Sequence, residues 1–162
     1  MKKICWRTIF KKKAIIISVT VLFVGLLVYC FLPPIDGMPL TLPQKKQIEF
    51  SWNRECQRKF PGWADMDSDR KWGLVSYGTY SGYTILLYIP AGQNCMVGSF
   101  RLDGYNFALP SASIDIYAYK NGEFCSLESA YGNNYITKDD LANIYDAHQE
   151  FLRSVWPGLA DK

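Results

Sequence analysis

The longest apolar run of the chain lies close to its N-terminus. Residues 14–32 read AIIISVTVLFVGLLVYCFL and contain no charged side chain. At about 1.5 Å of rise per residue, a helix of this length spans roughly the 30 Å hydrocarbon core of a bilayer. Pro33 and Pro34 then end the helix, because proline lacks the amide hydrogen that would continue it. The pattern predicts a transmembrane helix over 14–32, with the lipid bilayer as its partner.

Basic residues flank only one end of this segment. Residues 1–13 carry six of the 18 Lys and Arg side chains and no acidic one. The positive-inside rule therefore predicts a single-pass cell-membrane protein with a cytoplasmic tail over 1–13 and its C-terminal part outside. From residue 14 onward there are 12 basic and 15 acidic residues. This balance argues against nucleic acid as a partner, because phosphate binding needs clustered Lys and Arg.

Three other interpretations of the segment are weaker. A buried core helix rarely has so long an uncharged run beside a basic cluster. A cleaved signal peptide has an apolar region of roughly 7–15 residues and an A-x-A-like site, neither of which is found here. A lipoprotein signal would modify Cys30 but needs a small residue before it, where this chain has Tyr29. We favour an uncleaved signal-anchor and leave cleavage and lipidation open.

A short linker and a helix are expected next. Residues 33–43 (PPIDGMPLTLP) hold four prolines and show no helical period, which predicts a semi-rigid stalk. Between residues 44 and 60, apolar side chains then recur at every fourth position: Ile48, Trp52, Cys56 and Phe60. This spacing predicts an amphipathic helix that ends at Pro61-Gly62.

The pattern of residue types along the chain changes after residue 69. Short runs rich in aromatic and branched residues predict strands at 74–80, 83–89, 96–102, 105–108, 114–119 and 123–127. Turn residues separate them, including Ser81-Gly82, Asp103-Gly104 and Asn121-Gly122. Asn-Gly and Asp-Gly are strong hairpin signals, so the strands are expected to form an antiparallel β-meander.

The chain ends in a second amphipathic helix. Thr137 is a suitable N-cap, and Asp140 stands where a capping box usually has Glu or Gln. One face of this helix carries Leu141, Ile144, Tyr145, His148 and Leu152, and Pro157-Gly158 closes it. A shorter helix is expected over 127–131. Residues 44–162 are thus predicted to form one extracytoplasmic α+β domain, a meander with its helices packed against one face.

Six motifs of the second half of the chain form a recognisable pattern: YGTYSGY (77–83), FA (107–108), IYAYKNGEF (116–124), LESAY (127–131), ITKDDL (136–141) and IY (144–145). Together they resemble a family of small secreted or membrane-anchored proteins of Gram-positive bacteria that has no assigned activity. The sequence departs from the family pattern at 132–135 and in its cysteines. The resemblance implies the meander-plus-helix fold and a Gram-positive cell surface, and it implies no catalytic function.

Three of the five cysteines fall in the expected outer domain, where a disulfide can persist. Cys95 opens one expected strand and Cys125 lies in another, which makes them a possible pair. Cys56 lies on the apolar face of the first helix, where a thiol behaves as a small hydrophobe. Three buried thiols are the alternative, because connectivity does not follow from sequence. There is no Cys-x-x-Cys pair to suggest zinc or thioredoxin chemistry.

The sequence identifies no catalytic residue, cofactor or metal site. Asp65, Asp67 and Asp69 alternate as in a calcium loop, but Arg70 and Ser76 stand where an EF-hand needs Gly and Glu. His148 is the only histidine and lies in line with apolar residues, so it is expected at the edge of a helix–sheet contact. Acidic residues are scattered without the motif of a glycosidase pair.

Tyrosines provide the remaining candidate site. Those expected to line an outward sheet face are Tyr77, Tyr80, Tyr83, Tyr117 and Tyr119. Such a face can bind peptides or sugars, although cross-strand tyrosine pairs often only stabilise a sheet. The leading hypothesis is a non-enzymatic cell-surface module that binds an extracellular protein, peptide or glycan. A membrane-complex subunit or immunity-type protein is the second hypothesis, and an envelope hydrolase with an unrecognised site is the third.

Overall fold

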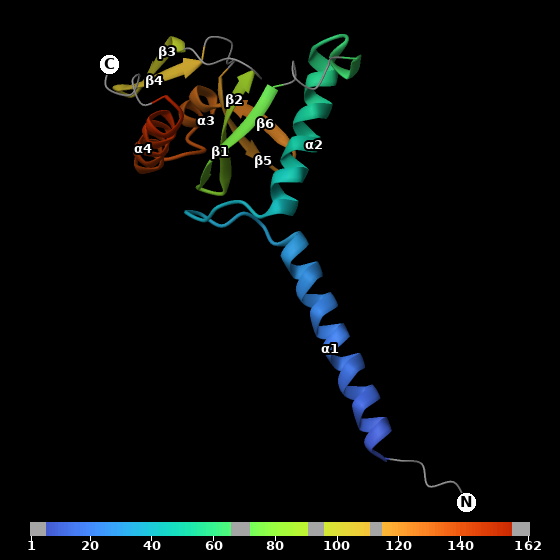
Figure 1. Ribbon diagram of the computed structural model, residues 1–162. Coiled ribbons are helices and arrows are strands. Elements are labelled where there is room, and N and C mark those ends of the chain that lie inside the picture. Colours follow the sequence, from blue (N-terminus) through green and yellow to red (C-terminus); the bar gives the residue numbers. More distant parts are fainter. Residues whose placement is uncertain (1–5, 66–71, 91–95, 111–114, 157–162) are drawn as a thin grey trace, which may run out of the picture. The chain divides into compact units, whose positions relative to one another are not determined.

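The computed structural model describes residues 6–65, 72–90, 96–110 and 115–156 of the chain. The chain divides into two compact units, Met1–Pro33 and Pro34–Lys162. Among the described residues, the first unit contains helix α1 (Trp6–Phe31), and the second contains six strands and the remaining helices (Figure 1). The second unit is α+β, with antiparallel sheets and flanking helices, as the sequence predicts.

Helix α1 begins before the predicted span and runs through the basic cluster, because Lys and Arg are good helix formers. Its apolar part, Lys13–Phe31, has a mean hydropathy of 2.7 and is not buried within the protein. The Thr20 hydroxyl donates to the Ile16 carbonyl at 2.9 Å, which satisfies it without water. In the described chain this is the one helix long and apolar enough to cross a membrane, as an anchor or a signal sequence.

Strands of the second unit form two separate sheets. The larger contains β1 (Trp72–Tyr80), β2 (Tyr83–Pro90), β5 (Ile116–Lys120) and β6 (Glu123–Ser126). These strands lie in the order β1-β2-β5-β6, and every neighbouring pair is antiparallel. The smaller sheet is the hairpin of β3 (Met96–Leu102) and β4 (Tyr105–Pro110).

Each hairpin turns at the residue pair expected from the sequence. Both residues of Ser81-Gly82, Asp103-Gly104 and Asn121-Gly122 have positive φ, between 46° and 90°. Two-residue turns of this kind match the twist of the flanking strands, and glycine adopts the second position without strain. The three turns therefore set the register of the hairpins β1–β2, β3–β4 and β5–β6.

The prediction of one continuous meander is wrong, because β2 pairs with β5 and not with β3. β2 is apolar on both of its faces, from Ile85 to Tyr88, as a central strand buried on both sides must be. The β3–β4 hairpin instead packs against helix α4 (Lys138–Val155). Phe107 of β4 is fully buried there, with its ring 5.3 Å from that of Tyr145 and 5.6 Å from that of His148.

Helices cover both faces of the larger sheet, which corrects the expectation of one covered face (Figure 1). On one side Ile85, Leu87, Ile116 and Ala118 form a core with α4 and with α3 (Leu127–Gly132). On the other side Leu86 and Tyr88 lie in core clusters with residues of helix α2 (Leu42–Lys59). Successive strand residues point to opposite faces, so a strand apolar at every position needs a cover on each side.

Helix α2 buries the face that the sequence predicts. Ile48, Trp52 and Cys56 are at most 4% exposed, whereas Phe60 follows the helix and is 39% exposed. The Trp52 ring lies 3.7 Å from that of Tyr88, centroid to centroid. At the start of the helix the Thr41 amide donates to Gln44 Oε1 at 2.7 Å. This bond satisfies one of the N–H groups that have no backbone acceptor within the helix.

The capping box of α4 is complete although its third residue is aspartate. Thr137 Oγ1 accepts a hydrogen bond from the Asp140 amide at 3.1 Å, and the Thr137 amide donates to Asp140 Oδ2 at 2.8 Å. The predicted face of α4 is buried at Leu141, Ile144, His148 and Leu152.

The proline-rich segment expected as a stalk makes contacts with the sheet. The Gly37 amide donates to the Thr79 carbonyl at 3.2 Å, and Asp36 Oδ1 accepts from the Gly82 amide at 3.2 Å. Leu40 is 8% exposed and belongs to the core cluster of Leu86 and Tyr119. This segment therefore belongs to the second unit from Pro34 onward.

Candidate binding groove along strand β1

Strand β1 forms one edge of the four-stranded sheet, so part of its backbone has no strand partner. The Thr79 carbonyl lies on this outer edge, because it accepts from the Gly37 amide. Thr79 is opposite Thr84 of β2, and backbone groups alternate between the two edges of an antiparallel strand. The β1 residues opposite Leu86 and Tyr88, which are Ser76 and Leu74, therefore also direct their N–H and C=O outward.

These outward groups are available for pairing. Within the described residues, the bond from Gly37 to Thr79 is the one backbone bond that reaches β1 from outside the sheet. A β-bulge between Ser76 and Gly78 interrupts the regular ladder, and Gly78 has a φ of 133°. Bulges bend a strand and increase its twist, so this open edge is also expected to be bent.

Two hollows lie beside this edge. The first, of about 270 Å³, lies between α2 and β1 and includes the apolar residues Ile48, Leu74 and Leu86. The second, of about 260 Å³, lies between the segment 37–40 and β1. Both are lined by Leu40, Lys45 and Ser76, so they are neighbouring parts of one depression. We call it the β1 groove; its part beside α2 is lined mainly by apolar residues, and open backbone groups of β1 lie along it.

Two opposite charges line the groove. Lys45 contributes to both hollows, and Glu49, one helical turn further along α2, contributes to the first. Neither side chain is in any of the ion pairs found within the described residues. A ligand in the groove therefore meets one cation, Lys45, which borders both hollows, and one anion, Glu49, which borders the first.

The five predicted tyrosines do not share one open face. Tyr77 is buried against α4, and Tyr119 is buried beneath α2, where its hydroxyl lies 3.2 Å from Ser51 Oγ. Tyr117 is half-buried, with its ring 5.1 Å from that of Trp52. As the alternation along β5 predicts, Tyr117 and Tyr119 lie on the sheet face opposite α3 and α4. That face is covered by α2.

Tyr80 and Tyr83 keep part of their surface accessible. Tyr80 lines the β1 groove, and its hydroxyl donates to the Tyr77 carbonyl at 3.2 Å. Tyr83 stacks on Tyr135 at 5.7 Å between centroids, and Lys120 Nζ lies 4.6 Å above its ring. Of the predicted site residues, Tyr77 and Tyr80 border the second hollow of the groove, and the Tyr77 side chain is buried against α4.

His148 lies inside the core and not at the edge of the helix–sheet contact. Its Nε2 donates to the Ala108 carbonyl at 2.7 Å, since a carbonyl can only accept, and its Nδ1 accepts from the Tyr77 hydroxyl at 2.6 Å. Burial lowers the pKa of His148 to about 4 and raises that of Tyr77. The imidazole is thus neutral at physiological pH, fully buried, and joins β1, β4 and α4.

Among the described residues, neither the cysteines nor the expected calcium loop forms a further site. Cys56 is 1% exposed, and burial raises the pKa of its thiol to about 11. Cys125 is half-buried, with Sγ 3.7 Å from the Ala118 carbonyl, and Cys95 lies outside the described residues, so their disulfide stays a prediction. Of the candidate calcium loop only Asp65 is described. Within the described chain, no three His, Cys, Asp or Glu side chains are placed to hold a metal ion.

A separate acidic hollow adjoins the start of α4. Its carboxylates come from Asp36, Asp140, Asp146 and Glu150. Burial acts to raise the pKa of Asp140, but hydrogen bonds from Ser81 and Thr137 outweigh it and hold the pKa below its ordinary value. Asp140 is therefore ionised and engaged in capping α4, which does not suit a proton donor in hydrolysis.

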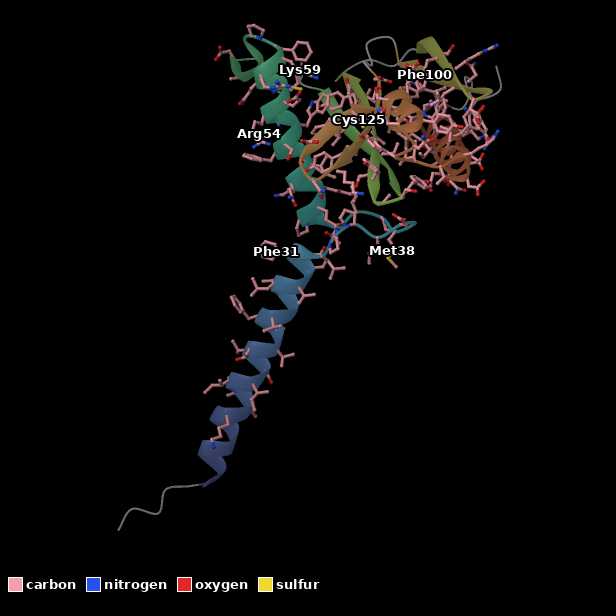
Figure 2. All side chains as sticks on the ribbon, turned by 180° about the vertical axis from the view of Figure 1, so that it is seen from behind. Phe31, Met38, Arg54, Lys59, Phe100 and Cys125 are labelled. Carbon is pink, nitrogen blue, oxygen red and sulfur yellow. The ribbon has the colours of Figure 1, made fainter. Side chains whose placement is uncertain are left out.

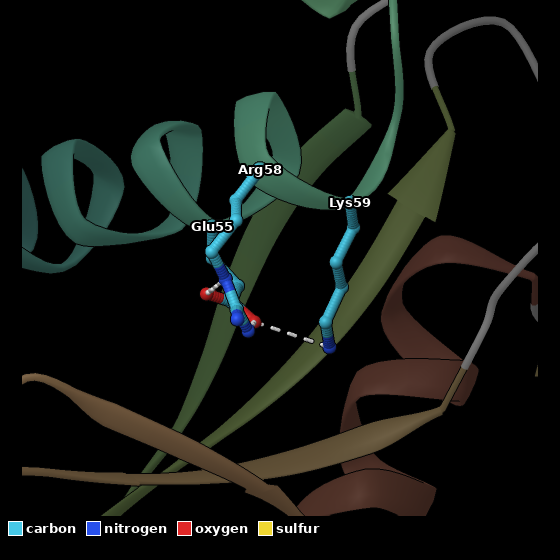
Figure 3. A network of polar contacts seen from close by, with 3 residues as sticks. All are labelled: Glu55, Arg58 and Lys59. Carbon is cyan, nitrogen blue, oxygen red and sulfur yellow. Dashed lines mark hydrogen bonds and ion pairs between the residues drawn. The ribbon is translucent and has the colours of Figure 1, made fainter.

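A network of surface ion pairs lies at the C-terminal end of α2 (Figure 3). Glu55 Oε1 lies 2.7 Å from Arg58 Nη2 and 3.2 Å from Lys59 Nζ. The hydrogen bond from Arg58 is the main cause that holds the pKa of Glu55 below its ordinary value. Basic residues in the last turn also suit the helix dipole, so this network is explained by the helix itself.

Comparison of the chain with protein-family models, with curated proteins and with solved structures gave no match. The family resemblance of the sequence motifs stays a prediction, and function has to be argued from the groove. Sequence reasoning missed this groove. Gly78 inside a predicted strand was its one available signal, because an isolated strand glycine often marks a bulge.

Proposed function

We propose that the chain is a single-pass membrane protein whose outer domain binds an extended peptide segment of another protein along the β1 groove. The observation that carries this proposal is the open edge of β1 at Leu74 and Ser76 beside an apolar depression. An extended peptide pairs with such an edge through its own backbone, and alternate side chains enter the neighbouring hollows. The domain is a binding module at the cell surface.

A peptide suits the groove better than a glycan does. Sugar-binding surfaces commonly present exposed aromatic rings, whereas Tyr77 and Tyr119 are buried and Tyr117 is half-covered. The outward N–H and C=O groups of β1 instead recur with the two-residue period of a strand. The apolar lining favours Val, Ile, Leu or aromatic residues at alternate peptide positions, and Lys45 favours an acidic residue among them.

The anchor is tested by its mass and its membrane retention. The full chain extracted from membranes is expected to have the mass of the uncleaved polypeptide, 18.6 kDa, and to resist extraction by alkaline carbonate. Both follow if residues 14–32 span the bilayer, since a largely apolar helix of 19 uncharged residues leaves lipid only at great cost. A mature chain that begins at or after residue 30, or one found in the aqueous fraction at full mass, overturns the anchor.

Peptide pairing is tested at Ser76. The detergent-solubilised full chain is used to select binders from a random peptide library, and we expect sequences with alternating apolar residues and an acidic residue. Ser76→Pro removes one outward N–H and is tolerated on an edge strand. We expect it to weaken the selected peptides about tenfold or more, because a lost hydrogen bond leaves its partner unsatisfied. Affinity is measured by calorimetry.

Ser76→Ala is the matched control, since it alters the same side chain and keeps the amide. We expect it to bind within about threefold of the wild type, because its backbone pairing is intact. Equal binding by the Pro and wild-type chains, with both folded by circular dichroism, contradicts strand pairing. A wild-type dimer that Ser76→Pro converts to a monomer would mean that a second copy, and not a foreign peptide, occupies the edge.

A further inference from the structure

Three exposed apolar side chains follow closely after the end of α1. Ile35 is 50% exposed, Met38 58% and Leu42 63%. The Met38 side chain points away from the sheet, out of the loop that precedes α2 (Figure 2). These residues are unlike Leu40 in the same segment, which is buried in the core. The segment thus packs one apolar residue inward and leaves three facing outward.

The length of chain between α1 and this segment limits how far apart they can lie. Helix α1 ends at Phe31, and three residues separate it from Ile35. At no more than about 3.6 Å per residue, Ile35 lies within roughly 15 Å of the last residue of the helix along the chain. The polar interface of a bilayer is itself roughly 6 Å deep on each side, so Ile35 and its neighbours are held at or near it.

Charge around the three apolar residues also suits a lipid surface. Lys45 and Lys46 are exposed in the first turns of α2, only a few residues after Leu42. Asp36, the one acid between Ile35 and Met38, accepts from the Gly82 amide and so is directed to the protein. Basic side chains beside exposed apolar ones are the composition of segments that lie at the headgroup boundary.

We infer that Ile35, Met38 and Leu42 insert into the headgroup region of the membrane that holds α1. The occupant of this apolar surface is the lipid bilayer, and the inference rests on the anchor proposed above. Insertion of three side chains fixes the loop to the membrane at a second place besides the span. The two bonds of this loop to the sheet, from Gly37 to Thr79 and from Gly82 to Asp36, then hold the β1 groove close to the bilayer surface.

A photo-crosslinking series tests the contact. A benzophenone amino acid is placed singly at position 38, 23 or 155 of the full chain, which is reconstituted in vesicles of equal parts phosphatidylglycerol and phosphatidylethanolamine. Phe23 lies in the apolar part of α1 and reports the span itself. Val155 is 47% exposed but lies near the far end of α4 from Asp140, which contacts Ser81 beside the loop. Lipid adducts are counted by mass spectrometry after irradiation.

We expect lipid adducts at positions 23 and 38, with at least a fivefold excess of position 38 over position 155. Adducts at 23 but background levels at 38 overturn the insertion and leave the anchor intact. Background levels at all three positions overturn the anchor, and the insertion with it. Equal yields at 38 and 155 indicate unspecific contact with vesicles and also contradict the inference. Circular dichroism of each chain confirms that the second unit is folded.

Discussion

Phe107→Ala is expected to destabilise the second unit by about 3–5 kcal/mol, a large part of the roughly 5–15 kcal/mol that holds such a domain folded. Phe107 is fully buried, and its ring stacks on that of Phe100 at 5.0 Å and meets that of Tyr145 edge-on. Its removal leaves a cavity between the β3–β4 hairpin and α4, because these rings come from rigid elements that cannot close around an alanine.

The measurement is urea unfolding of the full chain in detergent, followed by tryptophan fluorescence. Phe50→Ala is the matched control, since the same atoms are removed from a side chain that is 70% exposed, and we expect a change within about 0.5 kcal/mol. A loss at Phe107 no greater than that at Phe50 would mean that the hairpin does not pack on α4 as described.

The local structure of this chain follows from its sequence. Asp103-Gly104 and Asn121-Gly122 specify two-residue turns through their own backbone preferences, and the structure has both. The capping residue Thr137 and the apolar period from Leu141 to Leu152 likewise predict α4 with its buried face. Such signals are local, since each depends on residues only a few positions apart.

The pairing between strands that are distant in sequence was harder to predict. No local signal states that β2 pairs with β5 across the intervening hairpin, because that choice depends on how the whole core is covered. Apolar side chains at every position from Ile85 to Tyr88 are a signal of burial on both faces, and the expectation of one covered face did not use this signal. For the same reason the sequence did not reveal that α2, a remote segment, covers Tyr117 and Tyr119.

The β1 groove depends on two segments that are distant in sequence. Its walls are α2 with the segment 37–40 on one side and β1 on the other. Leu40 illustrates the difficulty, because a proline-rich neighbourhood predicts a linker whereas the side chain is in the core. Segments of this kind are assigned by composition, which carries no information on what they contact.

The free energy of unfolding of the second unit is expected to fall by about 3 kcal/mol as the pH drops from 6.5 to 4, through His148 alone. Its pKa is lowered from 6.5 to about 4, chiefly by burial, and each unit of difference is worth about 1.4 kcal/mol. Between these pH values the unfolded chain binds a proton that the folded chain does not. The stabilisation is therefore complete above pH 6.5 and lost as the pH approaches 4.

His148→Gln isolates this contribution, because a glutamine amide can also donate to the Ala108 carbonyl and accept from Tyr77 but does not titrate. We expect the variant to lose some stability at pH 7.5 and to vary little between pH 6.5 and 4. The acids whose pKa is lowered, Glu55, Asp103 and Asp140, titrate mostly below this window and are shared by both chains.

Urea unfolding at half-unit intervals from pH 7.5 to 4 gives the two curves. The wild-type curve should approach that of the variant as the pH falls, and cross it if glutamine costs less than about 3 kcal/mol at neutral pH. Parallel curves across the whole range would mean that the folded state accepts the proton. In that case the imidazole would have a partner or a path to water other than the two hydrogen bonds that hold it between β1, β4 and α4.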